Sequence, residues 1–188
     1  MRQGPLVIVS GPSASGKSTV VQRLLEQNSL PLRRAVTATT RQKREGERDG
    51  VDYHFWTLER FQEEIARGGM LEHACVFGRD WYGTPLTEVT PHRERGVGVI
   101  LIIDVQGAAQ VRARCPGVVS IFIRTGTLEV LERRLRERET ENEESIGRRL
   151  RTAREELARA GEYDYVVVND DLDTAVAEVR QILAAHFV

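Results

Sequence analysis

The sequence has 188 residues, of which 40% are hydrophobic and 29% are charged, and its formal net charge is −1 at neutral pH. These values predict a globular domain that needs no disulfide or structural metal to fold, and a charge this close to zero does not favour nucleic acid as a partner. The two cysteines, Cys75 and Cys115, form no CxxC pair, so neither a zinc site nor a disulfide framework is expected.

Apolar runs alternate with helical patterns along the chain, and this alternation predicts a parallel α/β sheet. In chain order we expect a strand at 5–10, a helix at 17–27, a strand at 33–41, a loop at 42–52, a strand at 53–56, a helix at 57–69, one or two strands in 70–85, a helix at 87–96, a strand at 97–104, a helix at 105–114, a strand at 117–124, a charged helical stretch at 127–161 broken near 139–144, a strand at 163–170 and a helix at 172–187. Thr57 is a good helix cap, and Pro91 suits a first helical turn.

The segment GPSASGKST, residues 11–19, follows the first expected strand and contains the complete pattern G-x-x-x-x-G-K-[ST]. Its glycines let backbone N–H groups turn toward phosphate oxygens, and the following helix adds its N-terminal dipole. Lys17 is expected to reach the β- and γ-phosphates, and the Ser18 hydroxyl to help hold Mg²⁺. The alternative is a turn without a ligand, but the full motif between a strand and a helix favours a nucleoside triphosphate site.

Five further segments follow in order: TATTRQKREGERDGVDYHF, MLEHACVFGRDWYGTP, IIDVQGAAQV, ETENEESIGRRL and YVVVNDDLDTA. With the phosphate-binding loop they resemble the guanylate kinase family, whose members phosphorylate GMP with ATP, from about residue 5 to residue 187. The resemblance implies an α/β fold: a three-layer P-loop NTPase core with a parallel sheet, an inserted small GMP-binding α+β region and a helical lid. In a single domain of residues 1–188, the core is then 1–36, 91–133 and 155–188, the GMP-binding region 37–90 and the lid 134–154.

By this resemblance one group of residues binds ATP: Gly11, Pro12, Ser13, Ala14, Ser15, Gly16, Lys17, Ser18, Thr19 and Asn169. Lys17 and three lid arginines, Arg134, Arg138 and Arg149, are then catalytic, because phosphoryl transfer needs charge stabilisation and exclusion of water. From the residues alone, the lid segment also fits a solvated helical pair with Glu–Arg contacts. Asn169, expected at the adenine of ATP, alternatively forms a turn after its strand.

The resemblance assigns the phosphate of GMP to Arg41, Arg44, Tyr53 and Tyr82. Arginine suits this role because its planar fork donates two parallel hydrogen bonds to a phosphate. The local sequence by itself is equally consistent with a solvated charged loop beside a core tyrosine.

The guanine base presents N1–H and N2–H₂ donors beside the O6 acceptor, and carboxylates accept such a pair of donors. The resemblance places these carboxylates at Glu72 and Asp104, with the hydroxyls of Thr37 and Thr84 near O6. Adenine would leave a buried carboxylate unpaired, which typically costs roughly 1–3 kcal/mol. The alternatives are a surface acid for Glu72 and a helix cap for Asp104.

The sequence departs from the family pattern at a few positions. Ala14 stands where a glycine is usual, and Thr37 and Thr84 stand where serines are usual. Ile102 replaces an acid that usually lies two residues before the aspartate at 104. We expect a working enzyme whose dependence on Mg²⁺ is altered by this last change.

Three functions therefore compete. The first is an ATP:GMP phosphotransferase of purine nucleotide metabolism, with ATP and GMP as small-molecule substrates, Mg²⁺ as cofactor, and neither nucleic acid nor membrane as a partner. The second is a non-catalytic guanylate kinase-like module that binds phosphopeptides, and the third is a related kinase with another phosphorylated acceptor. The intact phosphate loop argues against the second, and the two carboxylates argue against the third. With no long apolar segment and no signal peptide pattern, a cytoplasmic location is expected; the oligomeric state stays open.

Overall fold

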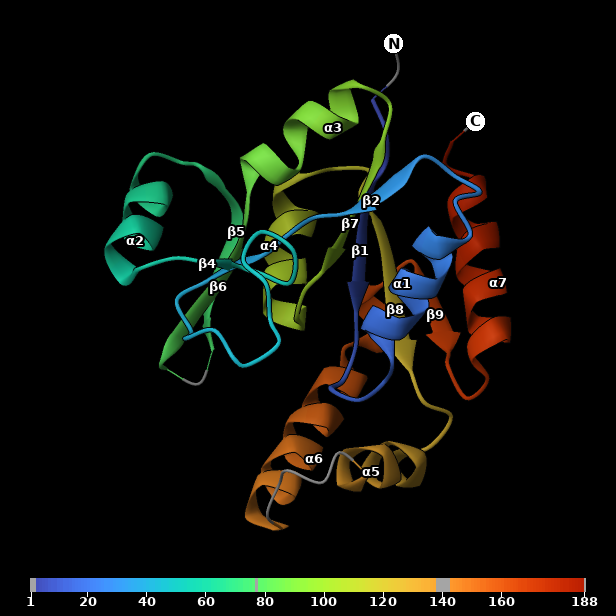
Figure 1. Ribbon diagram of the computed structural model, residues 1–188. Helices are drawn as coiled ribbons and strands as arrows, with labels where there is room; N and C mark the ends of the chain where they lie inside the picture. Colours follow the sequence, from blue (N-terminus) through green and yellow to red (C-terminus); the bar gives the residue numbers. More distant parts are fainter. Residues whose placement is uncertain (1–2, 77, 138–142, 188) are drawn as a thin grey trace.

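The computed structural model describes residues 3–76, 78–137 and 143–187, which form two β-sheets with flanking helices (Figure 1). The larger sheet has five strands in the order β2-β7-β1-β8-β9, and each neighbouring pair is parallel. These strands are β1 (Leu6–Ser10), β2 (Leu32–Arg34), β7 (Gly98–Ile102), β8 (Val119–Arg124) and β9 (Tyr165–Val168). The expected parallel sheet is thereby confirmed.

Helices cover both faces of the larger sheet and give the expected three layers. Figure 1 shows α1 and α7 on one face of this sheet and α4 on the other. Side chains alternate along β1, so that Val7 and Val9 pack in the cluster with α1 and α7, while Leu6 and Ile8 pack in the cluster with α4. Buried clusters on both sides explain why the central strands β7, β1 and β8 are mostly apolar on both faces. These helices are α1 (Lys17–Glu26), α4 (Val105–Arg114) and α7 (Leu172–Ala184).

The direction of the connections between strands reverses at the neighbouring strands β7 and β1. From β1 the chain passes through α1 to β2 on one side, whereas from β7 it passes through α4 to β8 on the other. In open parallel sheets a crevice forms at such a reversal, outside the carboxyl ends of the strands. The phosphate-loop segment and Asp104 follow the carboxyl ends of β1 and β7, so both lie at this crevice.

The smaller sheet has the order β4-β3-β6-β5 and includes both parallel and antiparallel pairs. Its strands are β3 (Ala38–Thr39), β4 (His54–Phe55), β5 (Met70–Val76) and β6 (Asp80–Pro85). Helix α2 (Leu58–Ala66) packs Phe61 against it, and the Thr57 side chain caps that helix as expected. The segment 70–85 therefore forms two antiparallel strands.

One predicted strand is wrong in extent. The segment 33–41 is not one strand: β2 belongs to the larger sheet and β3 to the smaller sheet. Between them, Ala35 N donates to Ile100 O and Val36 N donates to the Glu88 carboxylate, so the chain leaves the larger sheet at this point. Local periodicity does not reveal a change of partner strand, because both strands keep an extended backbone.

The remaining helices lie at the edges of this framework. The segment 87–96 is less regular than expected, because a 3₁₀ turn precedes a short α-helix that has Pro91 in its first turn. Helices α5 and α6 lie beside the loop between β1 and α1 (Figure 1), where Leu131, Leu135 and Ala153 pack around Ala14. No described helix is both long and apolar enough to cross a bilayer. The elements are η1 (Leu86–Glu88), α3 (Thr90–Glu94), α5 (Leu128–Arg136), α6 (Glu143–Ala158) and η2 (Ala160–Glu162).

Candidate active site

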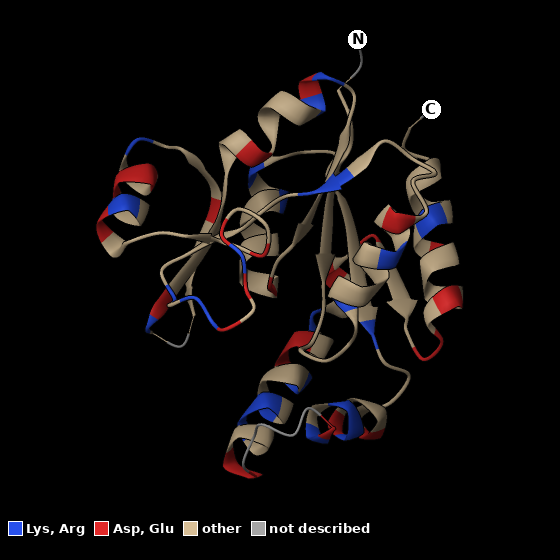
Figure 2. Cartoon of the chain, viewed as in Figure 1, with Lys and Arg blue, Asp and Glu red and all other residues tan. Residues whose placement is uncertain are grey.

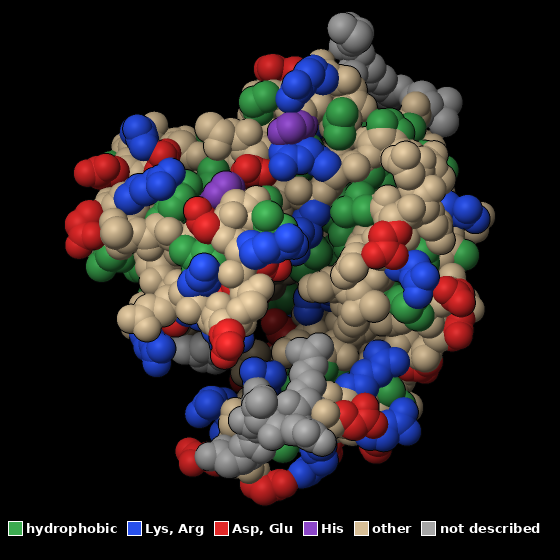
Figure 3. All heavy atoms as spheres, viewed as in Figure 1, with side chains coloured by type: hydrophobic (Ala, Val, Ile, Leu, Met, Phe, Trp, Pro, Cys, Tyr) green, Lys and Arg blue, Asp and Glu red, His purple; other side chains and the backbone are tan. Residues whose placement is uncertain are grey.

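A cleft of about 1000 Å³ lies at the carboxyl ends of β1 and β7, between the smaller sheet and α6. The space-filling view shows a hollow in this part of the molecule with charged side chains at its rim (Figure 3). Twelve of the residues predicted from the sequence line the cleft: Gly11, Ser13, Lys17, Ser18, Thr37, Arg41, Arg44, Tyr53, Glu72, Tyr82, Asp104 and Arg149. The cleft thus brings together segments that are far apart in the chain.

Other described residues that the sequence predicted are not part of the cleft lining. In the part of the chain that the structure describes, the lining does not include Pro12, Ala14, Ser15, Gly16, Thr19, Thr84, Arg134 or Asn169. Several of these hold lining residues in place, as the contacts below show. Arg138 lies outside the described residues.

The phosphate loop has the strained backbone that its sequence predicts. Gly11 and Gly16 have φ values of +139° and +88°, and a Cβ on Gly16 would overlap the Asn169 amide. Ala14 also adopts a positive φ of +65°, in the position where the family pattern has glycine. The Lys17 ammonium donates to the carbonyl oxygens of Gly11 and Pro12, both at 2.7 Å, so it lies over the loop. Because α1 begins at Lys17, the N-terminus of the helix, with the positive end of its dipole, faces the loop.

Asn169 and Arg134 brace this loop. The Asn169 side-chain amide donates to Ser15 O at 2.8 Å, and Arg134 Nη2 donates to Asn169 O at 2.9 Å. Asn169 is 4% exposed. The amide nitrogen of Asn169 is therefore engaged by the loop, and its expected contact with adenine stays a prediction.

A second group of cleft residues forms a basic, aromatic pocket. The Arg41 guanidinium pairs with Glu47 at 2.7 Å and lies over the Tyr53 ring, 5.5 Å from its centroid. Tyr53 and Tyr82 meet edge to face at 6.0 Å, and the Arg44 backbone N–H donates to the other Glu47 oxygen at 2.8 Å. The Arg41 side chain is only 11% exposed, so the alternative of a fully solvated loop does not hold for this residue.

Hydrogen bonding and burial keep Glu47 ionised and Tyr53 protonated at neutral pH. The hydrogen bond from Arg41 lowers the pKa of Glu47, and burial raises the pKa of the Tyr53 hydroxyl. Tyr53 therefore remains a donor at neutral pH, beside a guanidinium that is always charged. Figure 2 shows basic residues along the loop between β3 and β4, which carries Arg41 and Arg44. Guanidinium groups and hydroxyl donors of this kind suit an anionic group such as a phosphate.

Glu72 is a buried carboxylate in the wall of the cleft. Its residue is 3% exposed, and the Thr84 hydroxyl donates to Oε1 at 2.7 Å. Burial, reinforced by the nearby Asp104, raises the pKa of Glu72 to about 7, although the Thr84 hydrogen bond opposes the rise. The alternative of a surface acid is therefore wrong. A carboxylate kept in such surroundings needs donors, which a ligand with adjacent N–H groups would supply.

Asp104 caps a helix and also lines the cleft, so its predicted role at the guanine base stays a prediction that the cap does not exclude. Its Oδ1 accepts from the backbone N–H groups of Gln106 at 2.9 Å and Gly107 at 2.8 Å, so it caps α4. The same residue lines the cleft. Of the two expected hydroxyls, Thr37 lines the cleft, whereas the buried Thr84 donates its proton to Glu72 in this structure.

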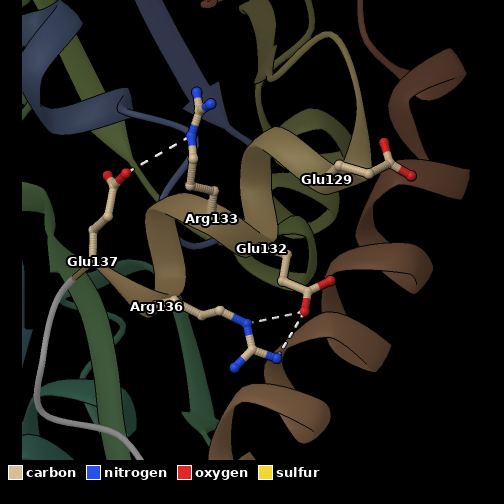
Figure 4. Close-up of a pocket in the computed structure, with 5 residues that line it drawn as sticks. All are labelled: Glu129, Glu132, Arg133, Arg136 and Glu137. Carbon is tan, nitrogen blue, oxygen red and sulfur yellow. Dashed lines mark hydrogen bonds and ion pairs between the residues drawn. The ribbon is translucent and has the colours of Figure 1, made fainter.

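The helical pair α5–α6 contributes to the cleft mainly through α6. Arg149 lines it, with Nη1 3.5 Å from Ser13 Oγ of the phosphate loop. The outer charges of α5 neutralise one another instead (Figure 4): Arg136 pairs with Glu132 at 2.8 Å, and Arg133 with Glu137 at 3.7 Å. These side chains, with Glu129, line a separate hollow of about 530 Å³. The solvated-face interpretation is thus correct for this part of the segment.

Sequence reasoning missed three α6 residues that line the cleft, Ser145, Arg148 and Glu156. Burial raises the pKa of Glu156 to about 7, with Asp104 raising it further and Lys17 lowering it. Glu156 thus belongs to the same charge cluster as the phosphate-loop lysine. No motif marks it, because it is one of many glutamates in a charged helix; only the tertiary packing distinguishes it.

The lining of the cleft includes oxygen donors of the kind that a hard divalent cation prefers. Ser18, Asp104 and Glu156 all line the cleft and offer oxygen atoms, whereas the Ile102 side chain offers none. Among the described residues, no three or more His, Cys, Asp or Glu side chains form a metal-binding group. Mg²⁺ accepts this arrangement, since it commonly keeps several waters and binds one or two protein groups together with phosphate oxygens.

Comparisons with known proteins find similarity to guanylate kinases in both sequence and structure. The family model described as guanylate kinase matches residues 3–186. The guanylate kinases of Carboxydothermus hydrogenoformans and Vibrio parahaemolyticus are each 45% identical to this chain, and each match covers 99% of this chain and 90% of the relative. The crystal structure of guanylate kinase from Anaplasma phagocytophilum superposes with a TM-score of 0.80 at 34% identity, covering 98% of this chain and 87% of that one.

Proposed function

The chain belongs to the guanylate kinase family, and from this premise we propose that it transfers the γ-phosphoryl group of ATP to GMP, giving ADP and GDP. One observation carries the proposal: a phosphate loop and a buried carboxylate line the same cleft. The loop supplies a site for the donor's phosphates, and the carboxylate supplies the chemistry that selects the acceptor's base.

The proposed donor site is the loop of residues 11–19 with the N-terminus of α1. Backbone N–H groups and Lys17 would hold the β- and γ-phosphates, and Asn169 would contact the adenine. Mg²⁺ would be held by Ser18 together with the phosphates, and when bound it neutralises phosphate charge. The Glu156 carboxylate lines the cleft and interacts electrostatically with Lys17, so it would orient the waters of the ion.

The proposed acceptor site lies on the other side of the cleft. Arg41, Arg44, Tyr53 and Tyr82 would bind the GMP phosphate, because they present a cation and hydroxyl donors toward one pocket. At the base, Glu72 and Asp104 would accept from N1–H and N2–H₂, and Thr37 and Thr84 would lie near O6. AMP offers neither donor, so a buried Glu72 would discriminate against it.

In the transfer step a GMP phosphate oxygen attacks the γ-phosphorus, and the bond from that phosphorus to the bridging oxygen of ADP breaks. The attacking oxygen is already anionic, so no protein general base is required. Lys17, Arg134, Arg138 and Arg149 would stabilise the charge on the transferred group. We propose that the lid, 134–154, closes on the core and on the 37–90 region and excludes water during the step.

The two alternatives find less support. A module that only binds phosphopeptides would have no need for Lys17 over an intact loop, or for Arg149 beside Ser13. A sugar phosphate has no pair of adjacent N–H donors that would call for the two carboxylates of Glu72 and Asp104 in one cleft.

The test is product analysis with ATP and Mg²⁺ against GMP, dGMP, AMP, CMP and UMP, one at a time. We expect ADP and the nucleoside diphosphate to appear together with the guanine nucleotides only. A Lys17→Met protein purified in parallel controls for contaminating kinases. Transfer to AMP at a similar rate, or no transfer to GMP, would contradict the proposal.

A further inference from the structure

Gly107 lies in the first turn of α4, directly behind the two carboxylates of the proposed guanine site. The residue is buried, and its backbone N–H donates to Asp104 Oδ1 at 2.8 Å. A Cβ built on Gly107 would lie 2.7 Å from Glu72 Oε2 and 3.6 Å from Asp104 Oδ1. The carboxylates of Glu72 and Asp104 therefore both lie next to Gly107, the one residue of α4 that has no side chain.

The position does not need glycine for its backbone. The glycines with a positive φ include Gly11 and Gly16 of the phosphate loop, whereas Gly107 has an ordinary helical backbone. Alanine would be the better helix former at this place. Glycine is consequently favoured here by packing, because a carboxylate oxygen of Glu72 lies where a Cβ would need space.

Glu72 cannot easily yield this space. Its residue is 3% exposed, and its other oxygen is already held by the Thr84 hydroxyl at 2.7 Å. A contact of 2.7 Å to a Cβ is shorter than real structures allow, so the carboxylate would have to move away from the helix. The atom that moves would be the end of a side chain, not backbone, so the fold itself need not change.

We propose that Gly107 is a specificity-determining residue: its missing side chain makes room for Glu72, and its N–H holds Asp104, so that both carboxylates can meet the guanine edge. The inference rests on the proposed function, since it concerns how the acceptor base is selected. Gly107 acts through these two side chains and is a positioning residue.

The test compares Gly107→Ala with the unmodified protein, using GMP and IMP as acceptors. IMP keeps N1–H but lacks the N2 amino group, so the ratio of kcat/KM for GMP to that for IMP reports on the carboxylates. We expect this ratio to fall by about tenfold or more in Gly107→Ala, because a displacement of order 1 Å in a positioning group can cost up to a hundredfold. The melting temperature of each variant is measured in parallel, so that a change in acceptor selection is distinguished from a loss of stability.

A double-mutant cycle identifies the route of the effect. Removing the Glu72 side chain opens the space, so Gly107→Ala should change neither the ratio nor the melting temperature in a Glu72→Ala background. If the single variant folds poorly while the double variant folds like Glu72→Ala, the clash with Glu72 is confirmed. Gly161→Ala is the matched control, because Gly161 is exposed and no atom lies within 4 Å of its Cβ.

Two outcomes would overturn the inference. One is a folded Gly107→Ala protein whose GMP-to-IMP ratio stays within about twofold of the original. The other is an equal effect in the Glu72→Ala background, which would indicate a general packing role. If the unmodified protein transfers phosphate to AMP as readily as to GMP, the proposed function fails, and this inference fails with it.

Discussion

Replacing Glu72 by glutamine should stabilise the protein while damaging its recognition of guanine. Burial raises the pKa of Glu72 to about 7 from a usual 4.5, so the native state binds this proton more tightly than the unfolded state does. The stability contributed by the protonated group is full below pH 4.5 and is lost as the pH rises through 7. Glutamine stays neutral throughout and can still accept from Thr84, whose hydroxyl donates to Oε1.

The expected change in stability follows from the size of the pKa shift of Glu72. Since each pKa unit corresponds to about 1.4 kcal/mol, ionising Glu72 in the folded protein costs about 3 kcal/mol of unfolding free energy at pH 8. Part of this cost is already present at pH 5, so the difference in stability between Glu72→Gln and the unmodified protein should grow by about 2–3 kcal/mol between pH 5 and pH 8. Glu156 also has its pKa raised to about 7, but it is present in both proteins and cancels in the comparison.

The assay is urea unfolding of both proteins without nucleotide at several pH values between 5 and 8 and at constant ionic strength. In parallel, GMP kinetics at pH 7.5 should show a large loss of kcat/KM in Glu72→Gln, because an amide nitrogen facing the base is a donor where an acceptor is needed. If the two stability curves stay parallel across this pH range, Glu72 does not carry the buried charge inferred for it. The reasoning about the site would then be wrong.

Three further predictions concern other parts of the cleft. Arg41→Lys should raise the KM for GMP by about tenfold or more, since lysine loses both the forked contact and the stacking on Tyr53; an unchanged KM in steady-state kinetics would remove Arg41 from the phosphate site. Ile102→Asp should reach half-maximal activity at a lower Mg²⁺ concentration, because it restores an oxygen ligand to the cleft, and superimposable Mg²⁺ titrations would refute this. Asn169→Ala should lower stability by about 1–3 kcal/mol in thermal or urea unfolding, because the carbonyl of Ser15 loses its buried donor, and unchanged stability would show that this brace contributes nothing.

Much of the architecture could be predicted from the sequence because the signals are local. The alternation of apolar strands and amphipathic helices predicted the parallel sheet, and the capping residue Thr57 predicted the start of α2. The phosphate loop was evident because its glycines and Lys17 act within nine consecutive residues. The family signatures then supplied the candidate acceptor residues, since they also occur as contiguous segments.

The remaining features depend on contacts between distant segments, which the local pattern does not encode. The division of 33–41 between two sheets depends on which strands pair, and the place of Glu156 in the cleft depends on how α6 packs. The environment of Glu72 is decided by Thr84 and by the absence of a side chain at Gly107, both of which are remote in sequence. The sequence by itself determined the element order, the phosphate loop and the candidate residues. Only the tertiary structure decided which carboxylates are buried, paired and close to one another, because burial and electrostatic coupling arise from packing in three dimensions.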